Sequence, residues 1–206
     1  MRPKLLVMLL LTSVAFSFIF PVQPDKYISA FKQKAALLTL SKSSEIVTYT
    51  LHYFPIELQA IRSYRQSKNA SKEIENELNE AKKQYQFLLE LNIPQNGTKE
   101  FLTFSDGGKN TYEQRLKYFS FQFGKDIQYL SKDNMWLPVE SFQFERNFGM
   151  TNQGSFLFEM PKENIGDTLK IELASKIYAH NTLEFTYTKK TLNSLPQLKK
   201  VSKWKK

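Results

Sequence analysis

The chain has 206 residues, with 29 basic side chains, 20 acidic side chains, two histidines and no cysteine. This length suits one domain with a substantial core, and the 41% hydrophobic and 14% aromatic content excludes a disordered chain. The lack of cysteine excludes a disulfide framework, a thiolate zinc site, an iron–sulfur cluster and a cysteine nucleophile.

The net charge of +9 is concentrated at the two ends of the chain. Arg2 and Lys4 stand near the start, and lysines without acidic neighbours fill the last eight residues. Without these charges the rest of the chain is nearly balanced. Because binding to nucleic acid needs a basic patch on the fold itself, we expect no nucleic-acid partner.

The first twenty residues are typical of an export signal. Arg2 and Lys4 precede an apolar run without charge, and Ala15 and Ser17 have the spacing that a signal peptidase prefers. The run is also about long enough to span a bilayer. We therefore predict that residues 1–20 are a signal peptide or a signal anchor. In either case the body is exported, to a periplasmic, extracellular or membrane-anchored position outside the cytoplasm.

The next segments are predicted as a short helix, a turn and a strand. Apolar residues recur at helical spacing over residues 27–38, and Ser41–Ser44 is rich in turn-forming residues. Strict alternation from Ile46 to Phe54, closed by Pro55, predicts a half-buried strand.

Residues 57–92 are predicted to be helical. One face of a helix collects the apolar residues Ile74, Leu78, Ala81, Tyr85 and Leu88. Glutamates early in this stretch and lysines after them suit the helix dipole. Leu58, Ile61 and Tyr64 predict a shorter helix before it, so that the two form a helical hairpin.

From Lys99 onward, alternation with a period of two predicts a series of short strands. The expected strands cover residues 101–104, 119–123, 127–130, 142–145, 156–160, 168–173 and 183–188. Asp106–Gly108 is a hairpin turn signal. Trp136, in a strand-like run that ends at Pro138, is expected in the core. One apolar face on each strand and short polar turns between them indicate antiparallel pairing.

The predicted fold is therefore α+β and β-rich. It is an antiparallel β-sandwich, with a closed barrel as the alternative, and a helical hairpin is inserted after the first strand. Residues 25–190 form a single β-rich domain with the helical segment 57–92, and residues 191–206 form a basic C-terminal tail.

No residue pattern predicts catalysis or cofactor binding. His52 and His180 have no orienting carboxylate nearby in sequence, and Glu140 and Glu145 fall on opposite faces of a continuous strand. A nucleophile elbow, a phosphate-binding loop and an EF-hand pattern are all missing from the sequence. We therefore predict no catalytic residue, no metal and no cofactor.

Two segments are candidates for partner contact. The first, where a strand ends in an irregular connection, consists of Arg146, Asn147 and Phe148. The second, in the C-terminal tail, consists of Lys199, Lys200, Lys203, Trp204, Lys205 and Lys206. Lysines around an indole suit an anionic membrane surface, whereas the alternative is a disordered solubilising tail.

These observations favour an exported, non-enzymatic protein, either envelope-associated or secreted. It would act through contact with a protein partner or an anionic membrane surface. The alternative is a carrier for an apolar small ligand in a barrel cavity, which the 17 phenylalanines and 10 tyrosines would line.

Overall fold

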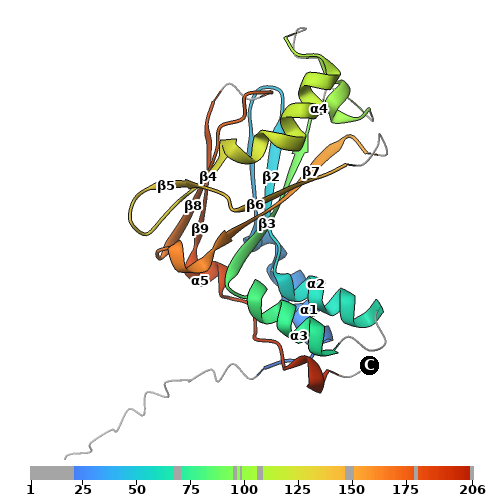
Figure 1. The fold of residues 1–206 in the computed structure, drawn as a ribbon, viewed down its shortest axis with the longest axis vertical. Helices are drawn as coiled ribbons and strands as arrows, with labels where there is room; N and C mark the ends of the chain where they lie inside the picture. The colour runs from blue at the N-terminus through green and yellow to red at the C-terminus, as the bar shows by residue number, and fades with distance from the viewer. Residues whose placement is uncertain are drawn as a thin grey trace, which may run out of the picture.

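Two antiparallel sheets face each other in the computed structural model, which describes residues 21–66, 71–94, 97, 99–105, 109–146, 151–178 and 181–204 (Figure 1). The five-stranded sheet has the order β1 (Thr39–Ser43), β2 (Thr48–Tyr53), β3 (Gln84–Asn92), β7 (Gln153–Pro161) and β6 (Ser141–Glu145). The four-stranded sheet has the order β5 (Trp136–Pro138), β4 (Ile127–Leu130), β8 (Thr168–Leu173) and β9 (Leu183–Thr188). The two sheets do not close into a barrel, so the sandwich prediction is confirmed and the barrel alternative is wrong.

Alternation of side chains explains why these segments form strands. In β2 the aromatic and aliphatic residues Tyr49, Leu51 and Tyr53 are buried, while the polar residues between them point outward, as predicted. The same alternation runs through β7, β8 and β9. Each strand thus places one apolar row between the sheets.

Aromatic rings fill the space between the sheets. Phe156 of β7 lies at the centre, with ring centroids 5.0–6.2 Å from those of Phe101, Phe119, Phe123, Phe142 and Phe144. Edge-to-face and offset contacts of this kind add to the free energy gained from burial. Tyr187 of β9 crosses to the other sheet, where its hydroxyl donates to the carbonyl oxygens of Leu38 and Leu51 at 3.3 and 2.8 Å.

Helices lie at both ends of the sandwich (Figure 1). Helix α4 (Tyr112–Phe121) and the 3₁₀ turns η3 (Phe101–Thr103) and η4 (Phe123–Asp126) cover one end. The shorter elements η1 (Ala35–Leu38), η5 (Lys162–Asn164) and α5 (Lys189–Leu192) adjoin the strands.

The opposite end carries a helical lobe, which consists of α1 (Pro24–Lys34), α2 (Ile56–Gln66), α3 (Ser71–Ala81) and the C-terminal residues 195–204 with η6 (Val201–Lys203). This lobe has its own small core, separate from that of the sandwich. Its buried residues are Tyr27, Ala60, Ile61, Ile74, Leu78, Val201 and Trp204. The hairpin of α2 and α3 is therefore where the sequence predicts it, although its turn at 67–70 lies outside the described residues.

The predicted helix through residue 92 is too long. Helix α3 ends at Ala81, and residues 84–92 form the central strand β3. Tyr85 points into the sandwich, whereas Leu88 lies on the opposite, outer face. A spacing of three residues puts Tyr85 and Leu88 on one face of a helix but on opposite faces of a strand. The spacing alone therefore does not tell which of the two structures forms.

The predicted strand at 119–123 is also wrong, because these residues belong to α4 and η4. Phe119 and Phe123 are buried, but Phe121 is 76% exposed. A capping box fixes the start of the helix. Thr111 Oγ1 accepts from the Gln114 N–H at 3.2 Å, and Gln114 Oε1 accepts from the Thr111 N–H at 2.8 Å.

Three shorter predictions are corrected as well. Residues 41–43 belong to β1, and the turn begins at Ser44, whose N–H donates to the Val47 carbonyl at 2.8 Å. The predicted strand at 101–104 is instead the 3₁₀ turn η3 followed by Phe104, and carbonyl groups of this segment accept hydrogen bonds from Arg115 and Tyr178. Trp136 lies on the outer side of the edge strand β5 and is 38% exposed.

None of the helices among the described residues has the length and apolarity that crossing a bilayer requires. The predicted signal segment, residues 1–20, lies outside that part of the chain.

The aromatic packing predicts a large difference between two phenylalanines. Phe156→Ala removes the ring that five neighbours contact, so we expect a loss of about 3–5 kcal/mol in the free energy of unfolding. Phe121→Ala removes an exposed ring and should change it by less than about 0.5 kcal/mol. Urea denaturation of both variants checks this, and equal losses would contradict the central position of Phe156.

Candidate functional site

The outer face of the five-stranded sheet, the face turned away from the second sheet, carries a continuous row of side chains. Strand register places Thr39, His52, Leu88, Leu157 and Gln143 side by side across β1, β2, β3, β7 and β6. The ends of this row are polar, with Thr39 and His52 at one end and Gln143 at the other. Its centre is apolar and consists of Leu88 and Leu157. The five residues come from five separate parts of the sequence, and only the pairing of the strands brings them together.

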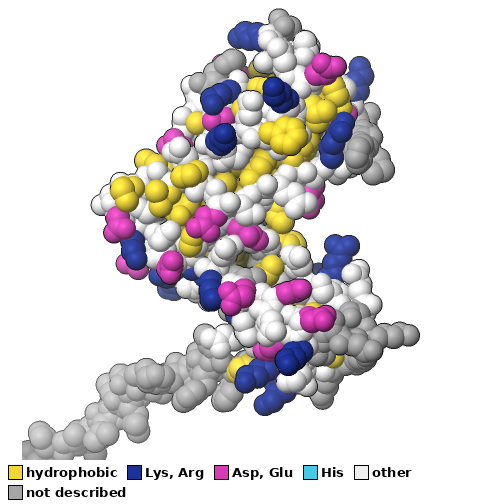
Figure 2. Space-filling view, viewed as in Figure 1, with side chains coloured by type: hydrophobic (Ala, Val, Ile, Leu, Met, Phe, Trp, Pro, Cys, Tyr) yellow, Lys and Arg dark blue, Asp and Glu magenta, His cyan; other side chains and the backbone are white. Residues whose placement is uncertain are grey.

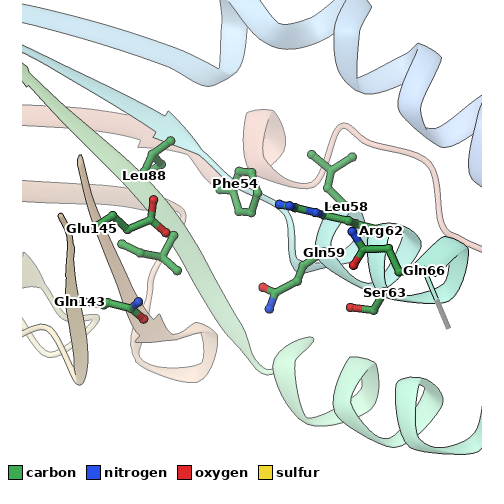
Figure 3. Close-up of a pocket in the computed structure, with 10 residues that line it drawn as sticks. Phe54, Leu58, Gln59, Arg62, Ser63, Gln66, Leu88, Gln143 and Glu145 are labelled. Atoms are coloured by element: carbon green, nitrogen blue, oxygen red, sulfur yellow. The ribbon is translucent and has the colours of Figure 1, made fainter. Parts of the chain in front are cut away.

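A groove opens between this face and helix α2 (Figures 2 and 3). Its volume is about 550 Å³, within the range of clefts that hold small ligands or peptide side chains. The lining residues are Phe54, Leu58, Gln59, Arg62, Ser63, Gln66, Leu88, Gln143, Glu145 and Leu157. Figure 3 shows α2 on one side of the groove and the residues of β6 on the other.

The groove combines an apolar floor with polar walls. Leu88 and Leu157 on the sheet, with Phe54 after β2, offer half-buried apolar surface. The carboxamides of Gln59 and Gln143 approach from opposite walls, and each can donate and accept hydrogen bonds. These groups match the hydrogen-bonding pattern of a peptide backbone.

The two walls of the groove also differ in charge. Arg62 comes from α2 and Glu145 from β6, and both are exposed. The groove therefore has a cationic wall and an anionic wall, which gives an elongated polar ligand a preferred direction.

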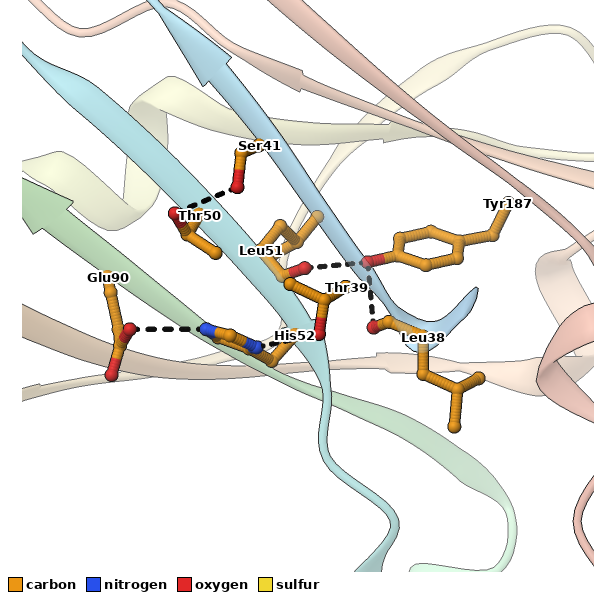
Figure 4. Close-up of polar contacts among 8 residues, drawn as sticks. All are labelled: Leu38, Thr39, Ser41, Thr50, Leu51, His52, Glu90 and Tyr187. Atoms are coloured by element: carbon orange, nitrogen blue, oxygen red, sulfur yellow. Dashed lines mark hydrogen bonds and ion pairs between the residues drawn. The ribbon is translucent and has the colours of Figure 1, made fainter. Parts of the chain in front are cut away.

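Beside the groove, three polar side chains form a line across β1, β2 and β3 (Figure 4). Thr39 Oγ1 lies 2.9 Å from His52 Nδ1, and His52 Nε2 lies 3.2 Å from Glu90 Oε2. With Nε2 protonated and donating to Glu90, Nδ1 accepts from the Thr39 hydroxyl. Both ring nitrogens of His52 then have a hydrogen-bond partner, and these bonds link the side chains of β1, β2 and β3.

The hydrogen bond from His52 lowers the pKa of the Glu90 carboxyl group below its ordinary value, despite the opposing effect of partial burial. No carboxylate stands near His52 in the sequence, and its partner comes from another strand. Glu90 is distant in sequence, and it reaches the imidazole because β2 and β3 pair in antiparallel register.

A second group of titratable residues lies in a crevice between the helical lobe and the sandwich. Burial and the nearby Glu57 carboxylate raise the pKa values of Tyr27 and Tyr53, so both phenols stay protonated in alkaline solution beyond the range of an exposed tyrosine. Lys162 lies 4.9 Å from the centre of the Tyr85 ring, and partial burial lowers the pKa of its ammonium group. Side chains around the crevice, both polar and apolar, therefore connect the helical lobe to the sandwich.

Within the described ranges, no three histidine, aspartate or glutamate side chains lie close enough together to hold a metal ion. His180 is outside those ranges.

The first predicted contact segment is only partly described. Arg146 is exposed just beyond β6, where its Nη2 donates to the Tyr112 hydroxyl at 3.3 Å. Asn147 and Phe148 lie outside the described residues. Arg146 therefore contacts α4 at the sandwich end opposite the helical lobe.

The second predicted segment, in the C-terminal tail, packs against the helical lobe up to Trp204, the last residue that the structure describes. Trp204 is 6% exposed, packs edge-to-face on Tyr64 with ring centroids 5.1 Å apart, and donates its indole N–H to the Lys199 carbonyl at 2.7 Å. The indole is therefore not presented to an interface, because the core of the lobe uses it. Lys200 and Lys203 are exposed, Lys199 is half-buried, and Lys205 and Lys206 lie outside the described residues.

The groove residues were not among the sequence predictions. Phe54 and Leu88 stood out only as members of predicted apolar patterns, and the glutamines carry no motif. One available signal was the mixed outer face of β3, where Leu88 interrupts a row of polar residues.

Comparison with known proteins adds one similarity. No family model matches the sequence, and no curated protein matches it. Among solved structures, the chain is similar to a DUF4426 family protein from Pseudomonas aeruginosa, with 11% identity, 74% of this chain and 94% of that chain covered, and a TM-score of 0.35. This similarity is too distant to bear on the site.

The line of Thr39, His52 and Glu90 predicts a pH-dependent contribution to stability. Because the pKa of Glu90 is lowered in the folded protein, its stabilisation is complete above the ordinary value of 4.5 and is lost as the pH falls through the lower, folded value. Glu90→Gln should therefore cost about 1 kcal/mol at neutral pH, and the difference from the native chain should shrink in acid. Thermal unfolding from neutral to acid pH measures it. The exposed Glu163→Gln serves as the control, and a Glu90→Gln difference that stayed constant with pH would contradict the assignment.

Proposed function

We propose that this chain is an exported, non-enzymatic binding domain, which holds an extended segment of a partner protein in the groove between α2 and the five-stranded sheet. The observation that carries the proposal is the composition of the groove: half-buried leucines between two carboxamide-bearing walls. Apolar side chains of a bound segment would gain free energy by packing on the leucines. The carboxamides would form hydrogen bonds with the N–H and C=O groups of its backbone.

Two further observations support a polypeptide ligand. Gln143 and Glu145 belong to β6, an edge strand of the five-stranded sheet, so the groove adjoins backbone that has no strand on its other side in the described chain. Extended segments bind readily beside such edges. Arg62 and Glu145 on opposite walls would then select the direction of the segment.

An apolar small molecule is the second candidate ligand. The space between the sheets is occupied by aromatic rings, so we place this alternative in the same groove, on Leu88 and Leu157. Native mass spectrometry of the protein from its own source separates the two. A reproducible small adduct that is lost on denaturation would favour the carrier.

The groove can be tested with a photo-crosslinking amino acid. Placed at Gln143 in the source cells, it should give one discrete protein adduct, whereas placed at Thr186, on the outer face of the other sheet, it should give none. Adding Leu157→Lys to the Gln143 probe should reduce the adduct at least about tenfold, since it puts a charge on the apolar floor. The proposal fails if both positions give the same adducts, or if Leu157→Lys leaves the adduct unchanged while the far-UV spectrum is native.

Export depends on the uncharged run near the start of the sequence. Leu10→Arg interrupts that run with a charge, so the chain should remain in the cytoplasm, whereas Leu10→Ile should be exported like the native chain. Cell fractionation with mass measurement of the product checks both variants and shows whether residues 1–20 are removed. Export of the Leu10→Arg chain at the native level would contradict the signal assignment.

A further inference from the structure

The two ends of the described chain meet on the helical lobe. The Val22 N–H donates to the Gln197 carbonyl at 2.8 Å, and the Lys199 N–H donates to the Val22 carbonyl at 3.0 Å. The Gln23 side chain adds a hydrogen bond to the Lys203 carbonyl at 3.1 Å. The uncharged N-terminal run therefore joins the fold beside the lysine-rich C-terminal segment.

The C-terminal segment is held in a fixed orientation. The Val201 N–H donates to the Glu75 carboxylate at 2.6 Å, and Val201 and Trp204 are both buried. Lys200 and Lys203 are exposed next to the buried Val201 and Trp204, so both lysines are directed away from the core of the lobe.

Helix α3 contributes to the same surface. Lys72, Asn76 and Asn79 are spaced four and three residues apart and so lie on one side of the helix. With Lys200 and Ser202 they line a shallow hollow of about 470 Å³. We call the surface formed by Lys72, Asn76, Asn79, Lys200, Ser202 and Lys203 the lysine face. Figure 2 shows Lys and Arg side chains at the lower end of the lobe, with Asp and Glu side chains close by.

Three of the four acidic residues of α3 lie on a neighbouring side of the helix. Glu73, Glu77 and Glu80 share one side by the same spacing, and none of them lines the hollow. Glu75, which does line it, is engaged by the Val201 N–H. These three glutamates lie about 100° around the helix from Lys72, Asn76 and Asn79, outside the hollow. Glu80 is paired with Lys83 at 2.7 Å.

We infer that the lysine face lies against an anionic phospholipid surface, with its lysines and amides contacting the headgroup phosphates. The lysines supply attraction, the hollow gives room for a headgroup, and the chain runs from this face into an uncharged segment about as long as a bilayer is thick. The inference rests on the export and signal segment proposed above. It does not involve the groove, and Trp204 takes no part in the contact.

Lysine footprinting on the full chain tests this without any substitution. The purified protein is reconstituted in bilayers of phosphatidylcholine, with or without phosphatidylglycerol, and its amines are acetylated and mapped by mass spectrometry. Lys72, Lys200 and Lys203 should become at least about fivefold less reactive only when phosphatidylglycerol is present, and high salt should abolish the protection. Lys117, Lys125 and Lys132, exposed on the sandwich, should react equally in both bilayers.

A matched pair of variants supplies the second measurement. Lys72→Gln with Lys200→Gln and Lys203→Gln should lower the ratio of binding to phosphatidylglycerol-containing over pure phosphatidylcholine vesicles, by about fivefold for each lysine. The same three changes at Lys117, Lys125 and Lys132 alter the net charge equally and should leave the ratio unchanged. Equal losses in both variants, or protection of the three lysines in neutral bilayers, would overturn the inference. Because purified protein is used, a failure of export or of groove binding would not affect either readout.

Discussion

The antiparallel pairing of β2 with β3 is the constraint on which the rest of the structure depends. Tyr53, the last residue of β2, pairs with Phe87 of β3, although the helical hairpin of α2 and α3 separates them in sequence. Since the two strands are neighbours, the hairpin has to project from the end of the sheet. This projection places α2 beside the outer face and creates the groove.

A projecting hairpin cannot bury its apolar faces against the sandwich alone. The two chain ends supply the missing surface: Tyr27 from α1 on one side, and Val201 and Trp204 on the other. The lysines near the C-terminus therefore take fixed positions, because the residues between them are anchored in the core of the lobe. The basic segment is part of the fold to the last residue described, and its charge is directed to one side of the lobe.

Much of the fold could be predicted from alternation alone, and the two largest errors lie where two periodicities fit the same residues. Phe119 and Phe123 are buried in a helix as they would be in a strand, so only the exposed Phe121 distinguishes the two. Ile74 and Leu78 were assigned correctly, but the same helical spacing continued by accident into Tyr85 and Leu88 of β3. The capping box at Thr111 was the local signal that could have corrected the first of these errors.

The candidate site was much less predictable than the fold. The groove joins residues of α2 and β6, and the partner of His52 lies on another strand, so both arise from register and not from any local pattern. The lysines near the C-terminus were visible in the sequence, but the burial of Trp204 among Tyr64 and its neighbours depends on how α2 and α3 pack.

The parallel contact between Val22 and Leu198 also has a mechanical consequence. Tension applied between the first and last described residues would pull these two segments along their length in opposite directions. The two backbone hydrogen bonds that join them would then carry the load together, in shear. The force would then act on the helical lobe and not directly on the strands of the two sheets. The groove lies where the lobe and the sheet meet. A pull on the chain ends would therefore strain its α2 wall, which belongs to the lobe, before its sheet wall.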